Sequence, residues 1–186
     1  MCLQTPRLDF RRWSYDDVEL ASQMHADTNV MQHLTRLTDR NQVEAWVHDQ
    51  VEHHRQHGYG VWILEEKGTG AFVGYCGLST VSYQAHFTPA VEISWILKPE
   101  FWGKGLATEA AEAVIADGFE RLGLVKIVAT ASVANANSLQ VMRRLGMSHD
   151  ARDNFEHPLK STASGQKAQV LFRLSRDDWA KRHGAS

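Results

Sequence analysis

The chain has 186 residues, of which 43% are hydrophobic and 23% charged, and its formal net charge is −2 at pH 7. This length and composition predict one globular domain over residues 1–186 with a sizeable core. The slightly negative charge argues against a general nucleic-acid-binding protein. Two cysteines, Cys2 and Cys76, and the absence of a signal peptide or a membrane-length apolar run favour a reducing compartment, so we expect a cytoplasmic protein without a membrane partner.

Helix and strand signals alternate through the first half of the chain. Thr38 or Asp39 could cap the longest amphipathic helix of this half, and Gly58 is placed to end it. Gly74 and Gly77, inside a predicted strand, mark a bulge or close packing. The predicted elements are a strand over Leu8–Trp13, a helix from Tyr15 to about Ala26, a helix over Gln42–His57, and strands over Gly60–Glu66 and Ala71–Val81 joined by a turn at 67–70.

The second half contains a glycine turn between a strand and a helix, and it ends in a hairpin. Its predicted elements are a loop over Ser82–Pro89, a strand over Val91–Leu97, a helix that reaches Gly118, a strand over Val125–Ala131, a helix over Asn137–Leu145 and a hairpin over 151–174, whose polar middle, His157–Lys167, we expect to be mobile. No repeat or linker interrupts this order. The pattern therefore indicates a single α+β domain around a mostly antiparallel mixed sheet of about seven strands.

The most informative segment is the turn Trp102–Thr108, which contains two glycines one residue apart and leads into a helix. The first amides of a helix lack internal acceptors and carry partial positive charge, and glycine lets a phosphate approach the backbone closely. A Walker loop fits poorly because Lys104 lies between the glycines and no Ser or Thr follows it directly. A dinucleotide fingerprint fits poorly because Thr108 stands where its third small residue belongs. The turn therefore predicts a site for a phosphorylated cofactor.

This turn resembles the acyl-CoA motif of the GNAT N-acetyltransferases, which reads Gln/Arg-x-x-Gly-x-Gly/Ala. Gly105 and Ala107 match its last two fixed positions, whereas Trp102 departs from its Gln/Arg. A Trp-Gly-Lys-Gly version is common in the branch of ribosomal-protein alanine/serine N-acetyltransferases. The departure thus indicates a subfamily within the family.

Two further segments resemble the same family. The run Asn135–Met147 is similar to the family's later Asn-x-x-Ser helix, in which Ser138 or Asn137 could cap the helix and Gly146 end it. The segment Thr5–Trp13 is similar to the first strand and turn of the ribosomal-protein branch. The resemblance spans nearly the whole chain, and it implies a sheet that is splayed at the cofactor site and has helices on both faces.

The resemblance also implies acetyl-CoA as the donor and direct attack by an amine, without a covalent enzyme intermediate. The CoA pyrophosphate would lie on the backbone amides of the glycine turn. The pantetheine arm would run beside the 91–97 strand, where the Ile96 or Leu97 amide could stabilise the oxyanion. The residues implied in cofactor binding are Ile96, Leu97, Lys98, Trp102, Gly103, Lys104, Gly105, Leu106, Ala107, Thr108, Asn135 and Ser138.

Glu92 is the candidate general base. It is a lone carboxylate in an apolar strand, where desolvation would raise its pKa, and it matches a strand glutamate of many family members. The alternative is a structural role as the partner of a backbone or arginine group. The tyrosine that serves many relatives as general acid is replaced by Met142. Ser138 or a water is then the candidate acid, or the thiolate leaves unassisted. A helix cap that contacts pantetheine is the alternative role for Ser138.

The identity of the acceptor follows less directly from the sequence. Resemblance to the ribosomal-protein branch implies a protein N-terminal α-amino group. A small amine, such as an amino acid, polyamine or antibiotic, is the alternative, and a non-catalytic CoA-binding module is the third interpretation. We expect the loops Leu34–Asn41 and Ser82–Pro89 to form the acceptor wall. A homodimer is allowed, and no metal is expected, because the histidines of the second helix read as a solvated face: His48, His53, His54 and His57.

Overall fold

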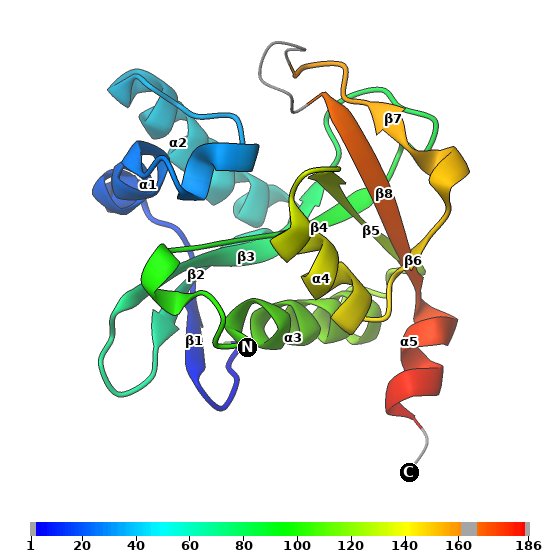
Figure 1. Ribbon diagram of the computed structural model, residues 1–186. Coiled ribbons are helices and arrows are strands. Elements are labelled where there is room, and N and C mark those ends of the chain that lie inside the picture. Colours follow the sequence, from blue (N-terminus) through cyan, green and yellow to red (C-terminus); the bar gives the residue numbers. More distant parts are fainter. Residues whose placement is uncertain (1–2, 161–166, 185–186) are drawn as a thin grey trace. The chain divides into compact units, whose positions relative to one another are not determined.

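The computed structural model describes residues 3–160 and 167–184, and its elements follow the predicted order (Figure 1). The chain forms two compact units, one of residues up to 79 with 94–114 and one of residues 80–93 with those from 115 onward. The strands are β1 (Leu8–Arg11), β2 (Val61–Glu66), β3 (Phe72–Thr80), β4 (Val91–Leu97), β5 (Lys126–Ser132), β6 (Ser148–His149), β7 (Phe155–Glu156) and β8 (Ala168–Ser175). The helices are α1 (Val18–Ala26), α2 (Arg40–His57), α3 (Leu106–Glu120), α4 (Ala136–Arg144) and α5 (Arg176–His183), with short 3-10 helices η1 (Tyr15–Asp17), η2 (Val30–His33), η3 (Pro99–Phe101) and η4 (Ala151–Asp153).

The strands form a mixed sheet in which antiparallel pairing predominates. In the first unit β1 pairs with β2 and β2 with β3, both antiparallel, and β4 is the next neighbour of β3. In the second unit the start of β4 pairs in parallel with β5, and β5, β6 and β7 all pair antiparallel with β8. The predicted α+β class and the hairpin of β7 and β8 are confirmed, whereas β6 was not predicted. The splaying of the sheet stays a prediction, and residues 161–166 of the loop expected to be mobile lie outside the described residues.

Apolar side chains cover both faces of the sheet in the first unit. Along β2, Val61 and Ile63 belong to a buried cluster with Met24 of α1 and Val47 of α2. Leu64, whose side chain points to the opposite face of the strand, is buried as well. Figure 1 shows α1 and α2 on one side of β2 and β3 and the start of α3 on the other. Helices therefore cover both faces of this unit, as predicted.

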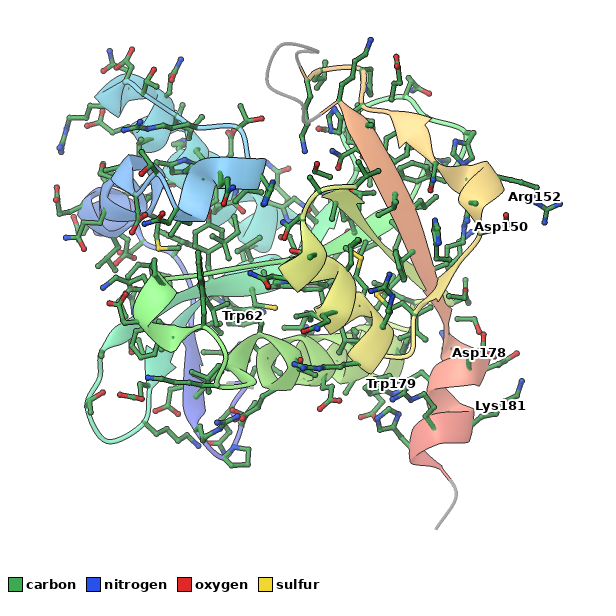
Figure 2. The ribbon with its side chains drawn as sticks, in the orientation of Figure 1. Trp62, Asp150, Arg152, Asp178, Trp179 and Lys181 are labelled. Carbon is green, nitrogen blue, oxygen red and sulfur yellow. The ribbon has the colours of Figure 1, made fainter. Side chains whose placement is uncertain are left out.

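The ends of α2 show how local chemistry sets a helix. The side chain of Asp39 accepts a hydrogen bond from the Asn41 N–H at 2.8 Å and caps the helix, which begins two residues earlier than predicted. Gly58 ends it in the left-handed conformation, with φ of 71°. One prediction about this helix is wrong, because His54 does not lie on a solvated face. It is buried, and its ring centre lies 4.4 Å from that of Trp62, which is labelled in Figure 2.

The second unit is built on the ladder between β5 and β8, and α5 follows β8 directly. This last helix was not predicted, although the sequence carries its signal in Ser175, which caps the helix by accepting a hydrogen bond from the Asp178 N–H at 3.1 Å. Trp179, labelled in Figure 2, is buried, and its ring centre lies 6.1 Å from that of Phe119 in α3. None of the described helices combines the length and apolar character needed to cross a membrane.

A bulge in the pairing of β2 with β3 brings the main chain of Gly74 close to β4. Leu64 pairs with Gly74, whereas the next residue, Glu65, pairs with Phe72, so one residue of β3 is left over. Gly74 has φ of 146°, and a Cβ atom there would lie 2.2 Å from the Ile96 carbonyl oxygen. Both the backbone angle and the lack of space therefore require glycine at this position.

The substitution Gly74→Ala tests this constraint. We expect it to lower the free energy of unfolding by about 3 kcal/mol, because it adds backbone strain and a clash with β4. The control is Gly70→Ala, where φ is 67° but a Cβ atom would meet no heavy atom within 4 Å. The control should lose about 1 kcal/mol from strain alone. Urea denaturation of both variants measures the difference, and equal losses would contradict the close approach.

Candidate active site

The glycine turn lies in the first unit, between η3 and α3. Gly103 and Gly105 both adopt left-handed conformations, with φ of 73° and 79°, and residues 102–105 are exposed. Because α3 begins at Leu106, its first N–H groups have no acceptor within the helix. The turn therefore presents backbone donors and the positive end of a helix on an exposed segment, which suits an anion.

Thr108 provides an independent sign that this turn takes a ligand. Its hydroxyl oxygen is buried and has no hydrogen-bond partner among residues 3–160 and 167–184. A buried hydroxyl without a partner costs free energy, which an oxygen of a ligand at the helix N-terminus would recover. A Cβ atom at Gly103 would meet nothing within 4 Å, and one at Gly105 would meet the Arg7 side chain at 3.7 Å. The residues present fit a bulky phosphate-bearing group such as the CoA pyrophosphate.

The main chain at the end of β4 is already engaged in part. The Lys98 N–H donates to the Val73 carbonyl at 2.9 Å, so this amide belongs to the sheet. The Leu97 carbonyl accepts a hydrogen bond from the Trp102 indole N–H at 2.7 Å. Since backbone groups alternate sides along a strand, the Leu97 N–H points away from β3, whereas that of Ile96 points toward it. Leu97 is thus the better of the two predicted oxyanion donors, and Trp102 ties the turn to β4.

Glu92 lies in the second unit, where β4 pairs with β5. Its Oε1 atom accepts two hydrogen bonds from Thr130, one from the backbone N–H at 3.0 Å and one from the hydroxyl at 2.5 Å. Burial raises the pKa of Glu92, although the bonds from Thr130 and the charge of Lys160 oppose this rise. The backbone bond agrees with the structural role considered for Glu92. However, no hydrogen bond to Oε2 occurs in the described part of the chain, so this oxygen can take a proton.

Three residues near Glu92 were not recognised in the sequence. The Tyr83 hydroxyl is buried and makes no hydrogen bond of ordinary geometry among the described residues. Burial and the Glu92 charge raise the pKa of Tyr83, although an interaction of its hydroxyl with Thr130 opposes this rise. Its ring centre lies 4.2 Å from that of His157, whose pKa is lowered by burial and by Lys160. Burial also lowers the pKa of Lys160, although the negative charge of Glu92 opposes this lowering. Tyr83 lies within the loop Ser82–Pro89 that was expected to form the acceptor wall, but loop residues show no periodicity, so none of the three was singled out.

The start of α4 differs from the prediction in one respect. The side chain of Asn135 accepts a hydrogen bond from the Ser138 N–H at 3.1 Å, so Asn135 caps this helix and Ser138 or Asn137 does not. Ser138 lies in the first turn of α4. Met142 is 1% exposed and belongs to the core. The cap engages the carbonyl oxygen of the Asn135 side chain, whereas its amide hydrogens meet no acceptor among the described residues and could bond to a ligand.

Comparison with known proteins decides the family. The model of the acetyltransferase (GNAT) domain matches residues 7–148. The chain belongs to the GNAT acetyltransferases. The structure of a ribosomal L7/L12 α-N-protein acetyltransferase, RimL, in complex with coenzyme A superposes with a TM-score of 0.76 at 16% identity, covering 96% of this chain and 99% of that one. GNAT enzymes take acetyl-CoA as the donor, so this chain is an acyltransferase.

Two relatives have a higher sequence identity to this chain than RimL does. The uncharacterized protein YkkB of Bacillus subtilis is 32% identical over 132 residues, which is 71% of this chain and 76% of the relative. The FsC-acetyl coenzyme A-N(2)-transacetylase of Aspergillus fumigatus is 24% identical over 189 residues, which is 96% of this chain and 78% of the relative.

Within the described residues no group of three or more His, Cys, Asp or Glu side chains could hold a metal ion.

The substitution Thr130→Val tests how the Glu92 carboxylate is held. Loss of the hydroxyl removes a hydrogen bond that favours the ionised form, so the pKa of Glu92 should rise further. Carbon-13 NMR titration of the glutamate carboxyl groups measures this pKa without any substrate. Thr130→Ser keeps the hydroxyl and is the matched control. If the pKa of Glu92 is the same in Thr130→Val as in the parent protein, the hydrogen bond from the Thr130 hydroxyl is not formed in solution.

Proposed function

We propose that this protein transfers the acetyl group of acetyl-CoA to the N-terminal α-amino group of a protein, with Glu92 as the general base. The observation that carries the proposal is the state of the Glu92 carboxylate. It is desolvated, its pKa is raised, and its described hydrogen bonds end on Oε1 alone. A carboxylate of this kind is a stronger base than one in water and retains an oxygen for the incoming proton.

The other groups of the chain divide the remaining tasks. The amides of 103–108 and the Thr108 hydroxyl would hold the pyrophosphate of acetyl-CoA, which supplies an activated thioester when bound. An α-ammonium group has a pKa of roughly 8, so Glu92 needs to remove one weakly held proton before the amine can attack. The Leu97 N–H is the proposed donor to the developing oxyanion. Ser138 is the proposed proton donor to the departing sulfur.

The surroundings of Glu92 support an α-amino group as the acceptor. An α-amine of a protein is followed by a carbonyl oxygen, which requires a hydrogen-bond donor beside the base. Tyr83 stays protonated because its pKa is raised. Its hydroxyl makes no hydrogen bond of ordinary geometry among the described residues, although it interacts with Thr130. Lys160 adds positive charge in the same neighbourhood, as its mutual effect with Glu92 on their pKa values indicates. Such charge favours an acyl oxygen and disfavours a second ammonium group, as in a polyamine.

A small-molecule acceptor is the second candidate. It is favoured by the Aspergillus fumigatus transacetylase, whose name gives FsC as its substrate and whose similarity extends over 96% of this chain. Conversely, the likeness to the ribosomal L7/L12 enzyme, at 16% identity, concerns the fold alone. The chemistry near Glu92 therefore argues against a polyamine, and the preference for a protein N-terminus over a free amino acid rests on the resemblance to the ribosomal-protein branch.

Thiol release from acetyl-CoA tests the proposal with three sets of acceptors. The first set is peptides with free N-termini that begin with Ala, Ser, Gly or Met. The second is the same peptides with blocked N-termini, and the third is amino acids and spermidine. We expect release with the first set and none with the second. Faster release with spermidine or a free amino acid would favour the small-amine function. Binding of acetyl-CoA without release for every acceptor would favour a non-catalytic module.

The substitution Glu92→Gln tests the base. The rate should fall by about 10²-fold or more, and the rise of kcat/KM with pH that follows ionisation of Glu92 should disappear. Stability provides the control. Because the pKa of Glu92 is raised on folding, ionisation lowers stability as the pH rises through that pKa. Glu92→Gln should therefore be at least as stable as the parent at neutral pH. An unchanged pH–rate profile would remove Glu92 as the base.

A further inference from the structure

A bridge of charged groups connects the N-terminal segment of the first unit to the glycine turn. The Glu109 carboxylate, in the first turn of α3, accepts hydrogen bonds from the Thr5 hydroxyl at 2.6 Å and from the Arg7 backbone N–H at 3.1 Å. The Arg7 guanidinium also pairs with Glu109, through its Nε and one terminal nitrogen, at 2.6 Å each. Its other terminal nitrogen donates to the Lys104 carbonyl at 2.9 Å. One arginine therefore contacts both the helix and the turn.

The bond to the Lys104 carbonyl fixes the orientation of one peptide plane in the turn. In a trans peptide, the carbonyl of Lys104 and the N–H of Gly105 point in opposite directions. Because Arg7 holds the carbonyl on its own side, the Gly105 N–H is directed away from Arg7. Gly105 is also in a left-handed conformation. In a turn without the bond from Arg7, a glycine would move readily between this conformation and others. Arg7 thus restrains a glycine of the turn whose backbone would otherwise have wide conformational freedom.

The ion pair also adjusts the charge at the helix N-terminus. A carboxylate in the first turn stabilises the helix, but it would repel an incoming phosphate. Burial opposes ionisation of Glu109, but the bonds from Thr5 and Arg7 outweigh it and keep the pKa of Glu109 below its ordinary value. Arg7 supplies the compensating positive charge, and the Arg7 side chain is 50% exposed. The pair leaves the backbone amides as the groups that face an anion.

We propose that Arg7 is a positioning residue for donor binding, which orders the glycine turn by bridging Glu109 and the Lys104 carbonyl. This proposal rests on one part of the proposed function, namely that acetyl-CoA is the donor. It differs from a direct role, in which Arg7 would itself be a ligand of the pyrophosphate. It also differs from a purely structural role, in which loss of Arg7 would change stability and leave the affinity for CoA unchanged.

The test compares Arg7→Ala with Arg40→Ala in the full chain. Arg40 forms an exposed ion pair with Glu44 at 2.9 Å in the same unit, away from the turn in sequence, and is the matched control. Hydrogen–deuterium exchange of the protein without ligand should be faster over residues 101–110 in Arg7→Ala and unchanged in the control. Calorimetry should show that the Kd for CoA rises about tenfold in Arg7→Ala, as for loss of a charged hydrogen bond. S-acetyl-pantetheine lacks the pyrophosphate, so kcat/KM with this donor should stay the same.

Arg7→Lys separates the bridge from the charge. Lysine keeps the positive charge but cannot bond Glu109 and the Lys104 carbonyl with one planar fork. We expect it to resemble Arg7→Ala in exchange and in affinity, and it replaces that variant if the alanine protein does not fold. Weaker CoA binding with unchanged exchange would assign Arg7 as a direct ligand and overturn the proposal. Unchanged CoA binding would overturn it as well. Failure of the parent protein to bind CoA would instead contradict the proposed function.

Discussion

Burial of the Glu92 carboxylate is the constraint on which the proposed chemistry of this protein depends. A carboxylate removed from water is costly unless neighbouring groups bond to it, and here both donors come from Thr130, on the strand that pairs with β4. The bonds reduce the rise in pKa without cancelling it. The register of β4 and β5 therefore sets the proton affinity of the proposed base. A shift by one residue would place Thr130 on the other face of the sheet.

The two halves of the proposed reaction draw on different parts of the chain. In the proposal the donor would be held by main-chain amides, whose positions depend on backbone shape more than on side chains. This explains how Trp102 can replace the Gln/Arg of the family motif, since its indole secures the turn through the Leu97 carbonyl. The acceptor, by contrast, would meet side chains such as Tyr83 and Glu92. A few substitutions there would change the acceptor while the donor site stayed intact, which is consistent with a family that shares acetyl-CoA and differs in its amines.

Much of the fold was predictable because its signals are local. The cap of α2 at Asp39, the stop at Gly58 and the glycine turn each depend on a few consecutive residues. Glu92 was identifiable as a single charge in an apolar strand. In contrast, Tyr83 and Lys160 lie in loops, where no period distinguishes functional residues from solvated ones. Two local interpretations were wrong for a physical reason. His54 is buried because Trp62 packs against it, and Asn135 caps α4 because its side chain reaches the Ser138 N–H.

The contact of Arg7 with Glu109 has a consequence for the order of folding. The two residues are 102 positions apart, and closing a loop of this length costs conformational entropy before any contact compensates for it. Such long-range contacts form late and slow the folding of a domain. During synthesis, Arg7 leaves the ribosome long before its partner is made. The glycine turn can therefore reach its final geometry only after the helix carrying Glu109 has emerged and docked, so binding of a donor at this turn would require completed folding of this unit.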